Sequence, residues 1–429
     1  MLDEGLTYWN PWWDGSMERL DRVQHRPSQD EVMPLFERKE ILAITGGRRS
    51  GKTSLMYLLI REVLKDVPPR QVLYVNLDDP TFEDSQLPDI FDAYERLMDP
   101  RGKRYIFLDE VQRKVGWERW LKRLYDSHED VKLVVSGSNG SLLMTEYSTL
   151  LTGRDLAYEL FPLSFREFLE FRGLRTGSEV TLLRNRNRVL HLLDEYMSYG
   201  GFPEVALTPD VDMKVMLLKR YFRTIITRDV IARFDVREKG KLERLAVYLV
   251  TNMSNDISAK SIGKVLELTT TTVREHMDHF EDAYLFFYVN HFSYSLKHQY
   301  THERKVYCLD TGLRNAISFR FSGDVGRLME NVVYLELRKR GEVYYWSQRG
   351  TEVDFVLKED LEVSDLIQVC NDMSEEATRR REVTSLRKGM EEFGLGHGTI
   401  VTMDEEGTEE VDEGTIRIVP MWKWLLMGQ

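Results

Sequence analysis

The sequence predicts an α/β fold in which a mostly parallel sheet covered by helices is followed by a helical region and a second α/β unit. Short apolar runs alternate with helical patterns from about residue 40 to 162, and that alternation is typical of a parallel sheet with helices on its faces. A glycine-bounded loop joins the first apolar run to an apolar helix. Because 429 residues exceed the usual size of one hydrophobic core, we expect several domains.

Each apolar run in the first part of the chain is expected to form one strand. The runs are "EILAIT", "QVLYVNL", "RYIFLDE", "VKLVVSG" and "DLAYELF". From about 163 to 240 the pattern is helical, and "YGGFPE" (199–204) indicates a turn within it. A small helix-turn-helix unit and a hairpin are expected over 241–320. From 326 onward a helix and the strands "VYYWSQ", "EVDFVLK" and "LIQVC" precede a second helix and the strands "GTIVTM" and "TIRIVP".

Composition and charge limit the class of protein. The chain has 42% hydrophobic and 30% charged residues, as ordinary soluble globular proteins do. The net charge of -12 argues against nonspecific coating of nucleic acid, although a local basic face remains compatible with it. Two distant cysteines, Cys308 and Cys370, favour a reducing compartment. With no apolar run of membrane-spanning length and no secretory pattern at the N-terminus, we expect a cytoplasmic protein without membrane association.

The loop after the first apolar run fits a phosphate-binding pattern, in which a glycine and four residues precede Gly-Lys-Thr. Its glycines let backbone N–H groups wrap the phosphates, Lys52 places a cation on the outer phosphates, and Thr53 offers a hydroxyl to Mg2+. We therefore expect ATP and Mg2+ as cofactors. The expected nucleotide-binding residues are Gly46, Gly47, Arg48, Arg49, Ser50, Gly51, Lys52, Thr53 and Ser54.

Two carboxylates end the third apolar run, "RYIFLDE". Asp109 is suited to hold Mg2+ through its water shell, and Glu110 to orient and deprotonate the attacking water. An acidic pair at a strand end is often only solvated, but its position behind a phosphate loop favours the catalytic interpretation.

Two further polar residues follow along the chain. Asn139 comes after the fourth run and is expected to position the water against the outer phosphate, although it also suits the cap of the next helix. Arg154 lies before the fifth run and is expected to reach the phosphate of a neighbouring subunit as an arginine finger. The alternative for Arg154 is an ion pair with a surface acid such as Asp155. The finger interpretation predicts a homo-oligomer.

Taken in order, these motifs resemble the AAA+ ATPases. More closely, "ITGGRRSGKTS", "FLDEVQ", "SGSN", "LTGR", "PLSFREFL", "YGGFPE" and "TRDV" are similar to a prokaryotic family of AAA+ ATPases with a C-terminal winged helix and a restriction-endonuclease-like domain. The resemblance covers about residues 35 to 425. The domains expected are an N-terminal segment (1–35), a P-loop ATPase core (36–162), a helical lid (163–240), a winged helix (241–320) and a restriction-endonuclease-like domain (321–429).

Basic residues are concentrated between 214 and 244 in a chain that is acidic overall. Three interpretations remain open. These residues form a face that contacts phosphate, they form a solvated helix side, or one of them is a cation that reaches the nucleotide as lid arginines do. The helix-turn-helix pattern that follows places the run "TTTT" (269–272) at a helix start, where hydroxyls cap the helix or contact a DNA backbone. Winged helices also dock proteins, so DNA and protein both remain candidate partners.

The last α/β unit has the layout of a restriction-type nuclease core, but two of its chemical groups are missing. Glu330 and Asp354 supply two of the acids that collect Mg2+ in such a core. Gln368 and Cys370 stand where a glutamate and a lysine belong. Arginines at 379–381 are candidates for the missing cation, yet guanidinium is a poor proton acceptor. We therefore expect a degenerate nuclease site.

The sequence thus favours a Mg2+-dependent ATPase whose ATP state changes how a winged helix and a degenerate nuclease-like domain engage DNA. Two alternatives remain open: an active ATP-dependent nuclease, and an ATP-gated scaffold whose appended domains bind proteins.

Overall fold

The computed structural model describes residues 2–127, 130–138, 151, 153–318 and 325–427. The chain divides into two compact units. The first is Met1–Phe161 with Asp282–Tyr284, and the second is Pro162–Glu281 with Leu285–Gln429. No helix of the described ranges is long and apolar enough to cross a membrane.

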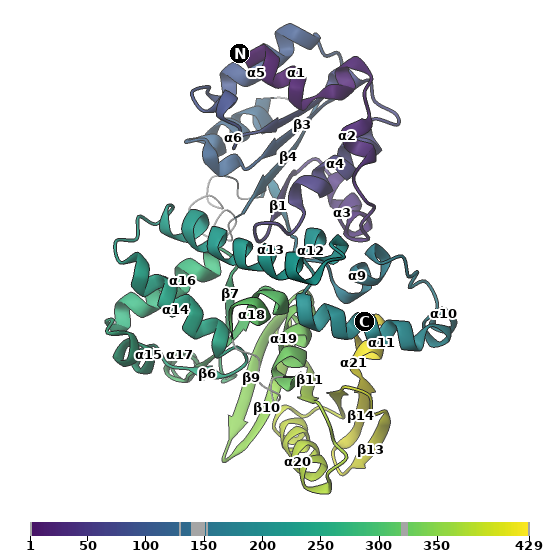
Figure 1. The fold of residues 1–429 in the computed structure, drawn as a ribbon, viewed down its shortest axis with the longest axis vertical. Coiled ribbons are helices and arrows are strands. Elements are labelled where there is room, and N and C mark those ends of the chain that lie inside the picture. The colour runs from purple at the N-terminus through teal and green to yellow at the C-terminus, as the bar shows by residue number, and fades with distance from the viewer. Residues whose placement is uncertain (1, 128–129, 139–150, 152, 319–324, 428–429) are drawn as a thin grey trace. The chain divides into compact units, whose positions relative to one another are not determined.

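A parallel five-stranded sheet forms the centre of the first unit (Figure 1). Its strands are β1 (Ile41–Thr45), β2 (Val72–Asn76), β3 (Arg104–Asp109), β4 (Val131–Gly137) and β5 (Asp155–Glu159). They lie in the order β2-β3-β4-β1-β5, and every neighbouring pair is parallel. The predicted strands and the predicted parallel sheet are therefore confirmed. All five strands end at one edge of the sheet, where Thr45 and Asp109 lie.

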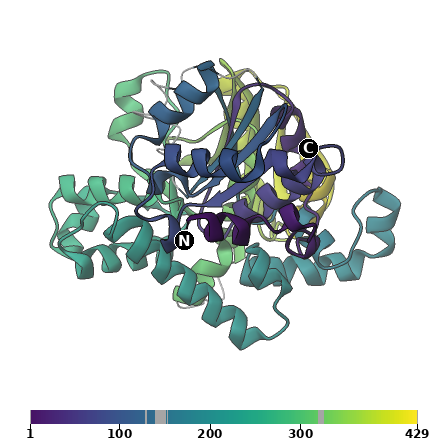
Figure 2. The same cartoon turned by 90° about the horizontal axis from the view of Figure 1, so that it is seen from above.

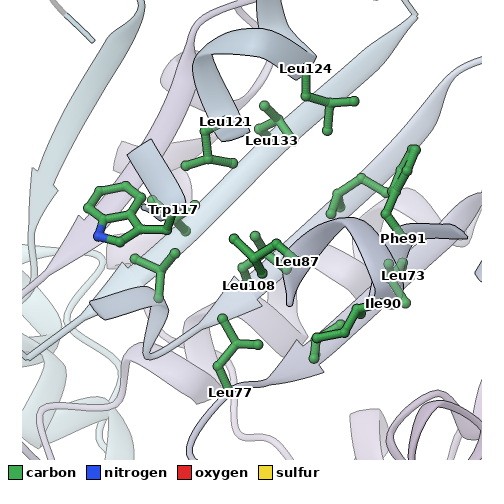
Figure 3. Close-up of a cluster of buried hydrophobic side chains, with 14 of the residues drawn as sticks. Leu73, Leu77, Leu87, Ile90, Phe91, Leu108, Trp117, Leu121, Leu124 and Leu133 are labelled. Carbon is green, nitrogen blue, oxygen red and sulfur yellow. The ribbon is translucent and has the colours of Figure 1, made fainter. Parts of the chain in front are cut away.

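Helices cover both faces of this sheet (Figure 1), and Figure 2 shows the whole chain from above. On one face, α1 (Leu2–Trp9), α5 (Leu87–Met98) and α6 (Trp117–Ser127) bury a leucine-rich core, part of which Figure 3 shows. On the other, α2 (Glu18–Asp21), α3 (Ser28–Phe36) and α4 (Lys52–Val63) cover a second core. Successive strand residues alternate between the two cores, which explains why the strands are continuously apolar.

The N-terminal segment packs on the free edge of β2. The Asn10 side chain donates to the Tyr74 carbonyl (2.8 Å) and accepts from the Tyr74 N–H (2.6 Å). The indole N–H groups of Trp12 and Trp13 both donate to the Val72 carbonyl, at 3.1 and 2.9 Å. Residues 1–35, predicted as a separate segment, thus belong to the first compact unit.

The second unit begins with helices. They are α9 (Phe165–Phe171), α10 (Glu179–Arg184), α11 (Arg186–Tyr199), α12 (Pro203–Leu207), α13 (Val211–Thr224), a π-helical turn Ile225–Ile231 and α14 (Lys239–Thr251). The turn "YGGFPE" lies between α11 and α12 and contacts Asp310, whose carboxylate accepts from the Gly201 N–H at 2.6 Å. A Cβ on Gly200 would lie 1.9 Å from that carboxylate, which explains the glycine there.

A pair of helices, a small sheet and two further helices follow. These elements are α15 (Ala259–Leu266), α16 (Thr270–Asp282) and the antiparallel strands β6 (Asp256–Ile257), β7 (Phe286–Val289) and β8 (Arg304–Cys308), in the order β6-β8-β7. The helix α17 (Leu296–Thr301) lies between β7 and β8, and α18 (Thr311–Ile317) follows β8. The Thr269 hydroxyl accepts from the Thr272 N–H at 3.1 Å, so the threonine run caps α16.

The chain ends in a six-stranded mixed sheet. Its strands are β9 (Glu342–Gln348), β10 (Thr351–Glu359), β11 (Glu362–Cys370), β12 (His397–Thr402), β13 (Gly407–Val411) and β14 (Gly414–Pro420), in the order β13-β14-β12-β11-β10-β9. The helix α19 (Val325–Leu337) precedes the sheet, α20 (Glu376–Phe393) packs on β10 to β12, and α21 (Met421–Met427) ends the described chain. The predicted second α/β unit is present.

Candidate nucleotide and metal site

The loop between β1 and α4 has positive φ angles that residues other than glycine rarely adopt. Gly46 and Gly51 have φ values of 139° and 104°, and Arg49 also lies in the left-handed region at 70°. A Cβ on Gly46 would lie 2.0 Å from the Leu160 carbonyl oxygen, so only glycine fits there. This geometry places the backbone N–H groups before α4 at the positive end of a twelve-residue helix, where they are suited to bind phosphate.

Two side chains of the loop are buried in a manner that suits a phosphate ligand. The Lys52 ammonium donates to the carbonyls of Gly46 (2.9 Å) and Gly47 (3.1 Å), so it lies across the loop. The Ser50 hydroxyl is buried, and within the described ranges it has no hydrogen-bond partner. A buried polar group without a partner is costly, and a phosphate oxygen would satisfy it. Lys52 and Ser50 therefore fit a phosphate ligand, and the wider set of predicted nucleotide residues stays a prediction.

Three hydroxyl groups converge on the Asp109 carboxylate at the end of β3. Thr53 and Tyr74 donate to its Oδ2, at 2.6 and 2.8 Å, and Ser136 donates to its Oδ1. Burial raises the pKa of Asp109, and the three hydroxyls oppose that shift. The two predicted metal residues, Thr53 and Asp109, are thus in direct contact. Their oxygens would hold a Mg2+ ion, which would supply positive charge beside the phosphates.

Glu110 follows directly, and its backbone is in the left-handed region with φ 57°. Its N–H donates to the Ser136 hydroxyl at 3.1 Å, and its carboxylate accepts from Ser138 (3.3 Å) and from Gln112. Such a conformation costs about 1–3 kcal/mol and is common at functional sites. Glu110 is therefore held beside Asp109 with its carboxylate oriented by neutral donors, as an acceptor of a water proton requires.

The other two predicted catalytic residues have different outcomes. Asn139 lies outside the described residues. The Arg154 Nε donates to the Asp126 Oδ1 at 2.8 Å, and this ion pair lowers the pKa of Asp126. The acid paired with Arg154 is thus on α6, whereas Asp155 was the acid suggested from the sequence. A role of Arg154 in a neighbouring subunit stays a prediction.

Several contacts of the site were missed by sequence reasoning. Tyr74 looked like an ordinary apolar strand residue, and Ser136 and Ser138 were passed over in favour of Asn139. Arg26, in the N-terminal segment, donates to the Ser50 carbonyl at 2.7 Å and thereby holds the phosphate loop. The two serines that alternate with glycine at the end of β4 were an available signal, whereas no local pattern indicates Arg26.

Comparison with known proteins places this site in a class. A family described as "AAA domain" matches residues 38–169, and two domains of unknown function, DUF8612 and DUF4143, match residues 190–323 and 325–424. "Uncharacterized protein MJ1544" of Methanocaldococcus jannaschii is 34% identical over 422 residues, which are 94% of this chain and 91% of that protein. The chain belongs to the family of this archaeal protein. A Haemophilus influenzae protein is 28% identical over 335 residues, 75% of this chain and 80% of that protein.

The solved structures that resemble this chain are less similar to it in sequence than these relatives. The Aeropyrum pernix Orc1 protein in complex with DNA has a TM-score of 0.34 at 14% identity, covering 72% of this chain and 95% of that one. AMPPCP-bound DnaA from Aquifex aeolicus has a TM-score of 0.26 at 17% identity, covering 59% and 86%. The AAA domain match, the parallel sheet and the phosphate loop together support a nucleotide-binding AAA+ ATPase domain.

A second cluster of charged residues lies in the second unit, where β8 meets α19 and β10. The Lys305 ammonium of β8 is 3.3 Å from Glu330 on α19, and it is 3.2 Å from Asp354 on β10. It also contacts Glu352 at 2.6 Å, and its side chain is only 5% exposed. Burial alone lowers the pKa of Lys305, but the neighbouring carboxylates raise that pKa well above its ordinary value. The cation among the predicted nuclease-type acids is therefore Lys305, which sequence reasoning missed.

The remaining residues of the predicted nuclease site have structural partners. The Gln368 side chain accepts from the Asp354 N–H (3.2 Å) and donates to Glu382 (2.8 Å). Cys370 donates to the Asp372 carbonyl at 3.3 Å, and burial raises the pKa of its thiol to about 11. No three His, Cys, Asp or Glu residues in the described ranges are arranged to hold a metal.

The arginines expected to supply the missing cation are engaged with other acids. Arg379 pairs with Glu405 and Glu409 at 2.9 and 2.6 Å, and Arg381 pairs with Glu382. The cation beside Glu330 and Asp354 is therefore Lys305 of β8, and not an arginine at 379–381.

The basic segment 214–244 divides into buried and exposed cations. Lys214 is buried and pairs with Glu195 at 2.5 Å, so it supports the fold. Lys219, Arg220 and Arg223 are exposed on successive turns of α13. Those three residues remain candidates for contact with phosphate.

Proposed function

We propose that this protein is a Mg2+-dependent AAA+ ATPase that couples ATP binding and hydrolysis to the engagement of DNA. Engagement is assigned to a winged helix, formed by α15, α16 and the sheet β6-β8-β7, and to a nuclease-like domain that has lost its catalytic chemistry. ATP and Mg2+ are the cofactors, the cytoplasm is the compartment, and a homo-oligomer is the working form.

The observation that carries the ATPase proposal is the contact between Thr53 and Asp109, with Glu110 beside them. Lys52 and the loop N–H groups bind the phosphates, and bound Mg2+ offsets the charge that develops on the outer phosphate. Glu110 accepts the proton of the attacking water. Arg154 is proposed to leave Asp126 and stabilise the outer phosphate of a neighbouring subunit, because an exposed ion pair costs little to break.

DNA engagement is supported by the helix-turn-helix arrangement of α15 and α16 and by exposed cations on α13. The capped start of α16 presents hydroxyls and backbone N–H groups of the kind that contact DNA phosphates. Lys219, Arg220 and Arg223 add a positive strip to a chain of net charge -12. The expected contact is therefore with the phosphate backbone, which predicts affinity that falls steeply with salt.

The loss of nuclease chemistry is supported by the surroundings of Asp354. Its two oxygens are engaged by the Lys305 ammonium and by the Val369 N–H (2.9 Å). Gln368 contributes a neutral amide where Mg2+ favours a carboxylate. The domain is proposed to act as a binding surface.

ATP turnover with and without single-stranded, duplex and branched DNA tests the proposal, with DNA affinity measured from about 50 to 200 mM salt. Lys52→Ala is expected to abolish nucleotide binding. DNA stimulation of turnover together with salt-dependent binding supports the proposal. Turnover without any DNA affinity favours the alternative of a protein scaffold, and Mg2+-dependent cleavage favours the alternative of an active nuclease.

A further inference from the structure

The Asp109 carboxylate is held by one donor that Mg2+ would engage and by two that it would not. Thr53 is the proposed Mg2+ ligand, so its hydroxyl contact is expected to change when the metal binds. Ser136 on β4 and Tyr74 on β2 hold the two oxygens of the carboxylate independently of the phosphate loop. The side-chain orientation of Asp109 in the metal-bound state therefore depends on these two hydroxyls.

Tyr74 is suited to act as a fixed donor. Its side chain is fully buried, and its hydroxyl donates to the Asp109 Oδ2 at 2.8 Å. Its ring packs on the rings of Tyr57 of α4 and of Trp9, with distances between ring centroids of 4.9 and 5.8 Å. The phenol thus sits between the strand that carries Asp109 and the helix that begins at Lys52.

The N-terminal segment determines where Tyr74 lies. The Asn10 side chain makes two hydrogen bonds with the backbone of Tyr74, at 2.8 and 2.6 Å, and it also donates to the Leu6 carbonyl at 2.8 Å. The Asn10 side chain is fully buried, so these bonds are shielded from water. The same segment also reaches the phosphate loop through Arg26 and the Ser50 carbonyl. One segment therefore supports both the metal aspartate and the phosphate loop.

We propose that Tyr74 is a positioning residue for the Mg2+-binding aspartate, and that Asn10 makes the N-terminal segment part of the ATP site. The proposal rests on the ATPase function proposed above. A misplaced Asp109 would weaken Mg2+ binding more than it would weaken the fold, because the ring of Tyr74 would still fill its place. Partners of metal ligands typically contribute about 10- to 100-fold in metal affinity or activity.

Tyr74→Phe is the direct test, since it removes only the hydroxyl. At saturating ATP we expect the Mg2+ concentration for half-maximal turnover to rise about 10-fold. Tyr94→Phe is the matched control, because Tyr94 is equally buried in the same unit and its hydroxyl donates to the Arg70 carbonyl at 2.8 Å. That control should lose one hydrogen bond without any change in Mg2+ dependence.

Asn10→Leu tests the contribution of the N-terminal segment to the position of Tyr74. It keeps the side-chain size and removes both bonds to Tyr74, so we expect a shift of Mg2+ dependence in the same direction as Tyr74→Phe and smaller. Trp12→Phe is its control, because the indole bonds to Val72 and has no bond to Tyr74. Thermal unfolding of all four variants separates a Mg2+ effect from a general loss of stability.

Two measurements make the outcomes distinguishable. Wild-type turnover that Lys52→Ala abolishes establishes the ATPase, and Mg2+-dependent binding of ATP in the same variants gives a readout that needs no hydrolysis. If wild type binds and hydrolyses ATP but Tyr74→Phe keeps the wild-type Mg2+ dependence in both measurements, the positioning role is wrong and the ATPase proposal stands. If wild type neither binds nor hydrolyses ATP, both proposals are wrong.

Discussion

Replacing Lys305 by methionine is the sharpest test of the charged cluster in the second unit. The substitution keeps the apolar stem and removes the ammonium, which leaves Glu330 and Asp354 buried without their cation. Removing one partner of a buried ion pair costs about 3–5 kcal/mol. The ammonium lies 3.2 and 3.3 Å from these two carboxylates and is shielded from water, so we expect a loss within this range.

The loss should also depend on pH. Burial raises the pKa of Glu330 to about 7 from its ordinary 4.5, even with the ammonium present. Without Lys305 that pKa rises further, so the folded variant binds more protons than the unfolded chain over this range. The stability of Lys305→Met therefore falls as the pH rises from about 4.5 through 7. The deficit relative to wild type is largest in alkaline solution.

Hydrogen exchange is the suitable assay, because a chain of two units need not unfold in one step. A loss of about 3–5 kcal/mol corresponds to faster exchange of the β8 and β10 amides by roughly 10²-fold to roughly 4 × 10³-fold. Lys358→Met is the matched control, since Lys358 on β10 pairs with the exposed Glu342 at 3.2 Å and should contribute about 0–1 kcal/mol. Adding Glu330→Gln to Lys305→Met should restore part of the protection. Equal effects of the two lysine variants would show that Lys305 does not balance buried charge.

Three further predictions concern catalysis. Glu110→Gln should bind ATP but hydrolyse it on the order of 10²-fold more slowly, measured by phosphate release; wild-type turnover would remove Glu110 from the mechanism. Mixing Arg154→Ala subunits with Lys52→Ala subunits should restore part of the turnover, since one mixed interface joins an intact pocket to an intact finger. Turnover that never exceeds the sum of the separate samples, while hetero-oligomers form, would contradict action between subunits. Labelled single-stranded, duplex and branched DNA should stay intact with Mg2+ and ATP, and cleavage by wild type but not by Asp354→Ala would reveal an active nuclease.

Local patterns predicted the first sheet and the phosphate loop because both are encoded in neighbouring residues. Strands buried on two faces require continuous apolar runs, and the loop requires glycines at fixed spacing before Lys52. The carboxylates of Asp109 and Glu110 were found for the same reason, since they end a recognisable strand. Each of these features depends on a few residues that are close in sequence.

Contacts between distant segments were beyond the reach of such patterns. Lys305 lies 25 residues from Glu330 and 49 from Asp354, and nothing in "ERKVYC" distinguishes its lysine from a solvated one. Tyr74 is 64 residues from Asn10 and 35 from Asp109. The role of "YGGFPE" became clear only when Asp310, 109 residues after Gly201, was found against it. Packing between segments that are distant in sequence decides which polar side chains come into contact.

The cover that Asn10, Trp12 and Trp13 give to β2 bears on how this protein behaves in concentrated solution. A bare outer strand is a template on which other chains add strands, and aggregates grow from such templates. The two indoles and one amide occupy the β2 carbonyls and an N–H that would otherwise recruit another chain. Replacing Asn10, Trp12 and Trp13 by residues without side-chain hydrogen-bonding groups should therefore yield material that aggregates more readily through strand pairing at β2.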